Sequence, residues 1–118
     1  MILKGSQRGN AAKLARHLMN ERDNEQVELH ELRGFVSDEQ LLDALLEAQA
    51  VAKGTRCHQH LFSLSLNPPE DERVDIEHFE TAIEMVEQQL GLDGHPRAIV
   101  FHEKEGRRHA HAVWSRID

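Results

Sequence analysis

The prediction of the fold starts from the stretch Ala98-Ile-Val-Phe-His-Glu-Lys-Glu-Gly-Arg-Arg-His-Ala-His-Ala-Val-Trp114. This stretch opens and closes with short apolar runs, as buried strands do. The segment between the runs, Glu103–Arg108, is polar and contains Gly106. Two apolar runs separated by polar residues and a glycine are typical of a β-hairpin. We therefore predict a strand, a six-residue turn and a second strand.

Three histidines of this hairpin form a candidate metal site. Side chains alternate across a strand, so His109 and His111 point to the same face, and the hairpin folds His102 back beside them. Three neutral imidazoles can converge on one divalent cation and leave its other coordination positions open, as in catalytic metal sites. The alternative is chance, because a chain with nine histidines is expected to contain roughly one His-x-His pair from composition alone. A second pair, His58-Gln-His60, is present.

The residues around these histidines resemble a known family. The segment Arg97–Ile117 resembles the third motif of plasmid-mobilisation relaxases of the MobA type, which belong to the HUH (His-hydrophobe-His) endonucleases. The segment Leu14-Ala-Arg-His-Leu-Met-Asn-Glu21 is similar to the first motif of the family, which holds the nucleophile. His60–Ser65 is similar to the strand that precedes the long middle helix of the family. In order and spacing, these elements cover nearly the whole chain.

Outside the hairpin, the hydrophobic pattern predicts strands and helices in alternation. The predicted strands are residues 1–4, 26–32 and 59–66, with a flexible loop over 5–9. The predicted helices are residues 10–20 and two more that begin at Ser37 and Asp75. We expect one α+β domain over residues 1–118, with five strands and packed helices. The resemblance implies a mainly antiparallel sheet with the two motif strands at its centre.

The second predicted helix carries two specific expectations. Ser37 is expected to cap it, and Gln40 three residues later would complete a capping box. Its apolar face is expected to consist of Leu42, Leu45, Leu46 and Ala50.

The distribution of charge favours a nucleic-acid partner in spite of a formal net charge of -7. Residues 1–20 contain four basic side chains and no acid, and the acids concentrate in other parts of the chain. Local potential, rather than net charge, guides a phosphate backbone. The alternative is ordinary solvated charge on helices and loops. The expected phosphate contacts are Lys4, Arg8, Lys13, Arg107 and Arg108.

Length and composition set further limits. We expect one domain, because 118 residues are enough for a hydrophobic core but leave no room for two domains. It contains no apolar stretch long enough to span a bilayer, so we expect no membrane partner. The single Cys57 cannot form an internal disulfide, which favours a reducing compartment and a cytoplasmic location. Relaxase domains usually continue beyond the third motif, so a truncated part of a larger relaxase is an open alternative.

The resemblance implies an enzyme that nicks DNA. Relaxases cut one strand at a plasmid transfer origin by transesterification and keep the 5′ phosphate covalently attached. The resemblance also implies a divalent metal, manganese or magnesium with zinc as an alternative, that stabilises charge on the scissile phosphate. The implied partners are single-stranded or locally melted origin DNA and relaxosome accessory proteins.

His17 is the candidate nucleophile. Most members of the superfamily use tyrosine, and this chain contains none. His17 stands at the nucleophile position of the first motif, and some mobilisation relaxases use histidine there. An imidazole can attack phosphorus and form a phosphoramidate. Either Glu21, one helical turn further on, or Asp23 just beyond it can orient or deprotonate the ring. The alternative is a helix-surface histidine without a role.

Two other functions stay open at this point. One is a catalytically weak DNA-binding module on the relaxase fold, and the other is a metal hydrolase of another kind that uses three histidines. Of the remaining histidines, His60 is interpreted as a residue that supports the metal ligands, and His30 as an exposed residue of a strand.

Overall fold

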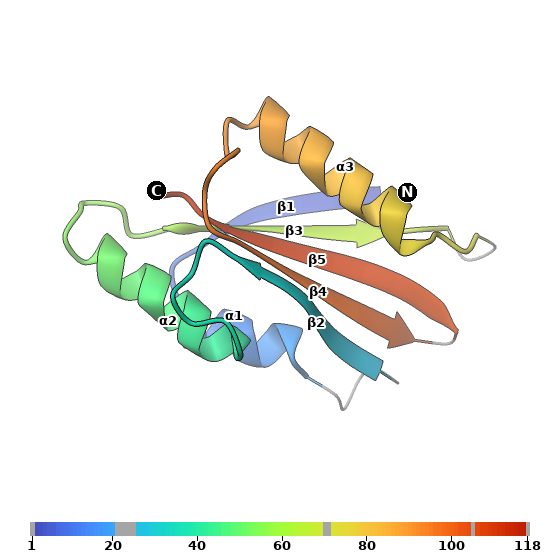
Figure 1. Ribbon diagram of the computed structural model, residues 1–118, viewed down its shortest axis with the longest axis horizontal. Coiled ribbons are helices and arrows are strands. Elements are labelled where there is room, and N and C mark those ends of the chain that lie inside the picture. Colours follow the sequence, from blue (N-terminus) through green and yellow to red (C-terminus); the bar gives the residue numbers. More distant parts are fainter. Residues whose placement is uncertain (1, 21–25, 70–71, 105, 118) are drawn as a thin grey trace.

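An antiparallel sheet forms the middle layer of the molecule (Figure 1). The computed structural model describes residues 2–20, 26–69, 72–104 and 106–117. Its strands in this part of the chain are β1 (Ile2–Arg8), β2 (Gln26–Arg33), β3 (Leu61–Asn67), β4 (Arg97–Lys104) and β5 (Arg107–Ser115). Its helices there are α1 (Ala11–Leu18), α2 (Leu41–Ala52) and α3 (Ile76–Gln89). The strand order is β1-β3-β5-β4-β2 with antiparallel neighbours, so the predicted α+β class and antiparallel sheet are confirmed.

The two motif strands lie inside the sheet, as the resemblance implied. β5 is the central strand, and β4 lies between β5 and β2. The turn between them is shorter than predicted, because Glu103 pairs with Arg108 and Lys104 with Arg107. Gly106 in this turn has a φ of 74°, which favours glycine. The prediction of a six-residue turn is wrong because backbone pairing continues into charged residues whose side chains stay near water at the end of the sheet.

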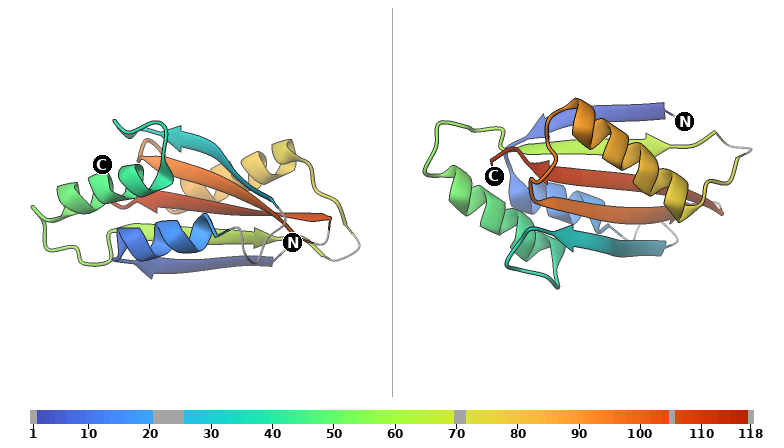
Figure 2. Two further views of the ribbon diagram at one scale, coloured as in Figure 1. Left: turned by 90° about the horizontal axis from the view of Figure 1, so that it is seen from below. Right: turned by 45° about the horizontal axis from the view of Figure 1, so that its top comes forward.

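The helices cover both faces of the sheet and divide the core in two. On one face, α1 and α2 contribute Leu14 and Leu45 to a buried cluster with Val100 of β4. On the other face, α3 contributes Phe79 to a cluster with Trp114 of β5. In the right-hand view of Figure 2, α3 lies in front of the sheet and α1 behind it. None of the helices in the described part of the chain is both long and apolar enough to cross a membrane.

β1 extends further than predicted. It pairs with β3 from Ile2 to Arg8, so the prediction of a flexible loop over residues 5–9 is wrong for most of that segment. Gly5 lies within the strand opposite Leu64, and the ring of Phe62 packs over it. A Cβ atom at Gly5 would lie 2.6 Å from Cζ of Phe62. This glycine therefore allows close packing in an edge strand and does not mark a turn.

The first helix agrees with its prediction, whereas the second begins later than predicted. Asn10 caps α1, and its side chain accepts a hydrogen bond from the backbone amide of Lys13. α2 begins at Leu41 after Gln40, which makes no capping hydrogen bond with its side chain. The predicted capping box is wrong, because the backbone amide of Ser37 donates to the Glu47 carboxylate at 3.0 Å.

The predicted apolar face of α2 is wrong except at Leu45. The helix buries Leu41 and Leu45, one turn apart, whereas Leu42 and Leu46 are 39% and 38% exposed. Ala50 is also exposed. Two pairs of leucines at helical spacing stand side by side in the sequence, and periodicity alone does not tell which pair faces the sheet.

A buried charge network holds α3 to the sheet. Glu87 and Arg97 are only 5% and 4% exposed. The Glu87 carboxylate accepts hydrogen bonds from Arg33, from Nε1 of Trp114 at 3.0 Å and from Nη1 of Arg97 at 3.3 Å. Nε of Arg97 also donates to Glu31 at 2.7 Å. Burial acts to raise the pKa of Glu87, but the hydrogen bonds from Arg33 and Trp114 outweigh it, so the pKa is lowered and the side chain is charged.

We predict that Glu87→Ala lowers the free energy of unfolding by about 3–5 kcal/mol, because it leaves Arg97 buried without one of its acidic partners. Gln88→Ala, an exposed change on the same helix, is the control and should cost less than about 0.5 kcal/mol. Urea denaturation of both variants measures the difference. Equal effects of the two substitutions would contradict the role of the network.

Candidate metal and nuclease site

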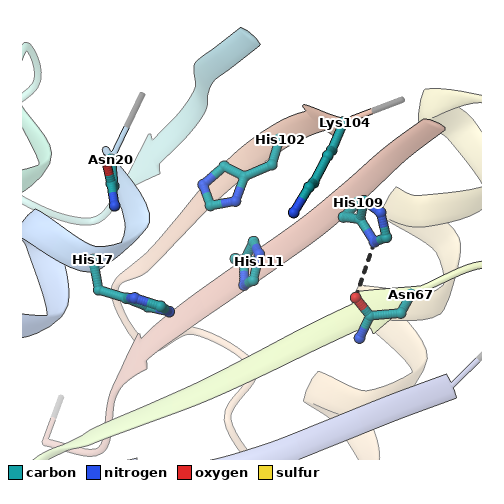
Figure 3. Close-up of a pocket in the computed structure, with 7 residues that line it drawn as sticks. All are labelled: His17, Asn20, Asn67, His102, Lys104, His109 and His111. Atoms are coloured by element: carbon teal, nitrogen blue, oxygen red, sulfur yellow. Dashed lines mark hydrogen bonds between the residues drawn. The ribbon is translucent and has the colours of Figure 1, made fainter. Parts of the chain in front are cut away.

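A cavity of about 280 Å³ lies between the end of α1 and the strands β4 and β5. The side chains that line it are His17, Asn20, Asn67, His102, Lys104, His109 and His111. Figure 3 shows that His17 points from the helix toward the strands that carry the other three histidines. The structure therefore brings the predicted nucleophile and the three predicted metal ligands to one cavity.

The register of the hairpin places its three histidines on one face. His102 is the cross-strand partner of His109, and His111 pairs with Val100. Val100 belongs to the core beneath α1 and α2, and side chains two residues apart share a face of a strand. All three histidines consequently face the α1 side of the sheet. The same strands bury apolar side chains under α1 and present histidines where α1 ends.

His102 is the most buried of the three, with 6% of its surface exposed. Its Nε2 donates a hydrogen bond to the carbonyl oxygen of Leu18, the last residue of α1. Its ring centroid lies 4.4 Å from that of His111. Burial lowers the pKa of His102 and outweighs the bond to Leu18, which acts to raise it. A neutral His102 thus ties the end of the helix that carries His17 to the sheet.

The other two histidines of the hairpin are half-buried and also neutral. Burial is the main cause that lowers the pKa of His109, and the charge of Arg107 lowers it further. Burial and the neighbouring His102 lower the pKa of His111 to about 3. Nδ1 of His109 lies 2.9 Å from Oδ1 of Asn67. Neutral imidazole is the protonation state that binds metal ions, so the chemistry of this set of donors fits a divalent cation.

The coordination geometry itself is not formed in the described residues. Among them, no group of three or more His, Cys, Asp or Glu side chains is arranged to hold a metal ion. The hydrogen bond from His102 to Leu18 also occupies one ring nitrogen. Binding through that nitrogen would require this bond to break.

His17 lies on the exposed surface of α1 at the edge of the cavity. It follows Lys13 by one helical turn, so both side chains emerge on the same flank of the helix. Glu21, its predicted partner, lies outside the described residues.

Two of the predicted phosphate contacts lie beside the histidines. Lys4 and Arg8 line a second cavity, of about 230 Å³, that shares His17 and His111 with the first. Both residues belong to β1, and the hydroxyl groups of Ser63 and Ser65 on β3 also line this cavity. A basic and hydroxyl-rich groove therefore continues from the histidines across the sheet toward β1.

The two arginines of the hairpin point to opposite faces. Arg107 shares the face of His109, and its Nη1 donates to the Pro68 carbonyl oxygen at 3.2 Å. Arg108 faces the α3 side, where its guanidinium carbon lies 5.6 Å from the centroid of the Phe101 ring. Adjacent residues of a strand point to opposite faces, so Arg107 lies on the face of the cavity and Arg108 does not.

Three further residues complete the cavity and were not predicted as site residues: Asn20, Asn67 and Lys104. In Figure 3 the side chain of Lys104 extends toward the space between His102 and His109. A signal for Lys104 was available, because it lies two residues after His102 on the same strand and therefore on the same face. Asn67 comes from a distant strand, and the hairpin pattern holds no signal for it.

Two interpretations of other histidines are wrong. His60 lies in a separate cavity together with Gly9 and Cys57, away from the hairpin histidines. His30 is not fully exposed, because 25% of its side chain is accessible and its ring centroid lies 4.9 Å from that of Phe101.

Comparison with known families shows the class of protein to which the chain belongs. Residues 12–118 match the family model described as relaxase, MobA/VirD2-like, nuclease domain. No curated protein and no solved structure matches the chain. The class is that of relaxase nucleases, which nick DNA for mobilisation, bind single-stranded DNA at the origin of transfer and generally use a divalent metal. The chain belongs to the MobA/VirD2-like relaxase family, and the resemblance inferred from its motifs is confirmed.

We predict that the metal-free protein loses stability as the pH falls below about 6.5, the ordinary pKa of histidine. His111 has a pKa of about 3 in the folded chain, so the unfolded chain binds more protons between these values and is favoured there. His102 and His109 act in the same direction. Urea denaturation in EDTA at about pH 7 and pH 5 measures the loss, which His111→Gln should reduce. Equal stability at both values would contradict this.

Proposed function

We propose that this chain nicks one DNA strand at a plasmid transfer origin by metal-dependent transesterification, with His17 as the nucleophile. His102, His109 and His111 would hold a divalent cation, manganese or magnesium, with zinc as an alternative. The observation that carries the proposal is the single cavity that His17 shares with these three histidines. We further propose that relaxosome accessory proteins assist the reaction and that it takes place in the cytoplasm.

The proposed chemistry is a displacement at phosphorus. A ring nitrogen of neutral His17 attacks, an N–P bond forms, and the bond from phosphorus to the 3′ oxygen breaks. The leaving 3′ oxygen takes up a proton, and the ring loses the proton on its other nitrogen. Glu21 is the proposed acceptor of that proton. The N–P bond keeps the energy needed for the joining reaction, in which the 3′ hydroxyl attacks the phosphoramidate.

The surroundings of the cavity support a phosphate substrate. A bound divalent cation supplies a positive charge that polarises the phosphate and stabilises the transition state. Lys104 lines the same cavity and adds a second positive charge on the side away from His17. Neutral histidine ligands would leave a bound cation with more net positive charge than carboxylate ligands would.

We predict that His109→Ala and His111→Ala each weaken the binding of Mn²⁺ by about 100-fold or more, because each removes one of three protein ligands. Titration calorimetry of the purified protein measures the affinity. His78→Ala is the control, since His78 is an exposed residue of α3 and does not line the cavity. Unchanged affinity in both hairpin variants would place the metal elsewhere.

We propose that the DNA strand follows the basic groove beside the histidines. Lys4 and Arg8 line this groove, and Lys13 emerges from α1 next to His17. Arg107 lies on the same face of the sheet at the hairpin. Arg108 is left out of this path because it packs on Phe101 at the opposite face.

We predict that Lys4→Gln and Arg8→Gln each weaken single-stranded DNA binding and reduce the salt dependence. About 0.7 units of log-log slope should be lost for each phosphate contact removed. Fluorescence anisotropy with a labelled oligonucleotide at several salt concentrations measures the slope. Arg108→Gln serves as the matched control with an unchanged slope. A larger loss of slope in Arg108→Gln than in the other two variants would indicate that the DNA strand follows the α3 face of the sheet.

We predict that the protein forms an SDS-resistant adduct with origin DNA in the presence of Mn²⁺ or Mg²⁺, and that His17→Ala abolishes it. The adduct should be acid-labile, because a phosphoramidate is cleaved by acid whereas a tyrosyl phosphodiester survives. Mass spectrometry of the digested adduct identifies the modified peptide. His58→Ala, an exposed histidine outside the cavity, should form the adduct normally.

The adduct experiment also separates the alternative functions. An undiminished adduct in His17→Ala would exclude His17 as the nucleophile. The absence of any adduct with any metal, together with retained DNA binding, would favour a catalytically weak DNA-binding module on the same fold. Cleavage that leaves no covalent intermediate would favour a metal hydrolase of another kind.

A further inference from the structure

Asn67 occupies a special place beside the hairpin histidines. It is the last residue of β3, which pairs with the central strand β5 through Ser65 opposite His111 and Leu66 opposite Ala110. The next position along this antiparallel pair brings Asn67 beside His109. Its Oδ1 lies 2.9 Å from Nδ1 of His109, and both residues line the same cavity. The dashed line in Figure 3 marks this contact.

Both polar atoms of the Asn67 side-chain amide make hydrogen bonds. Nδ2 of Asn67 donates to Oγ of Ser65 at 3.3 Å, and Oδ1 faces Nδ1 of His109. An amide oxygen can only accept a hydrogen bond, so Nδ1 of His109 carries the hydrogen. In the neutral ring, the lone pair is then on Nε2.

The backbone around Asn67 is also held in place. Pro68, the next residue, is buried, and its carbonyl oxygen accepts the bond from Arg107 on β5. Arg107 therefore connects the end of β3 to the strand that carries His109. The side-chain amide of Asn67 is thus bonded to Ser65, and the backbone after Asn67 is bonded to Arg107 through the carbonyl group of Pro68.

We propose that Asn67 is a positioning residue for His109, which it holds in the tautomer with hydrogen on Nδ1, so that Nε2 is free to bind a metal ion. This inference rests on the proposed function, in which His109 is a metal ligand. A hydrogen bond to the second ring nitrogen is the general means by which proteins orient a metal-binding histidine and increase its basicity. The loss of such a bond typically weakens metal binding by about 10–100-fold.

The tautomer is measured directly in the metal-free protein. Long-range ¹⁵N–¹H correlation spectra of ¹⁵N-histidine-labelled protein should show the hydrogen of His109 on Nδ1. Asn67→Leu keeps the approximate size of the side chain but removes the acceptor, so His109 should exchange between both tautomers. Asn67→Asp retains an acceptor and should keep the hydrogen on Nδ1. If Asn67→Leu does not fold, Asn67→Ala replaces it in the same comparison.

Calorimetry with Mn²⁺ on the same three proteins gives the second readout. Asn67→Leu should bind Mn²⁺ about 10–100-fold more weakly than the wild type, and Asn67→Asp at least as tightly as the wild type. A hydrogen on Nε2 of His109 in the wild type, or an unchanged tautomer in Asn67→Leu, would overturn the inference. If Asn67→Leu changes the tautomer of His109 as expected but the wild type binds no Mn²⁺, the positioning of His109 by Asn67 would still be supported. That result would refute only the metal assignment in the proposed function.

Discussion

The antiparallel pairing of β4 with β5 is the interaction on which the site depends. This pairing sets His102 opposite His109 and places His111 on the same face. A shift of one residue in the register would turn the histidines of one strand to the opposite face. The apolar residues of the same strands oppose such a shift, because Val100 and Val113 are fully buried under α1 and α2. The packing of the core thus fixes the geometry of the cavity.

The contact between α1 and His102 links the two halves of the site. His102 donates a hydrogen bond to the last carbonyl group of the helix, and His17 is the residue just before that group. Carbonyl groups at the end of a helix lack partners within the helix, and His102 satisfies one of them. The position of His17 relative to the strands therefore depends on a histidine that the proposed function also assigns to the metal. His17 and the hairpin histidines are therefore coupled through the hydrogen bond from His102 to Leu18.

The sequence predicted those features that arise from patterns within a segment. Alternation in the hairpin was sufficient to place His109 and His111 together. The third helix was correctly predicted to begin at Asp75, which caps α3. Prediction from the sequence failed where the structure of a segment depends on residues far away in the chain. Leu41 rather than Leu42 is buried, in the core cluster that includes Val100 of β4. Gly5 lies in a strand because it pairs with Leu64 of β3.

The site shows the same division between local and distant signals. The four histidines were predicted because motif positions and strand alternation place them, although the metal geometry and the role of His17 remain proposals. Asn67 was missed because its contact with His109 joins residues 42 positions apart. The opposite orientations of Arg107 and Arg108 follow from alternation, once the hairpin is known to pair up to Lys104. The prediction of a longer turn concealed that difference.

Anomalous X-ray diffraction from crystals of the protein with Mn²⁺ tests most directly the claim that these histidines form one metal site next to His17. The account predicts one strong peak in contact with imidazole nitrogens of His102, His109 and His111, with the ring of His17 facing the same cavity. A peak at the other histidine pair, His58 and His60, or no peak in the hairpin cavity at saturating Mn²⁺, would contradict it.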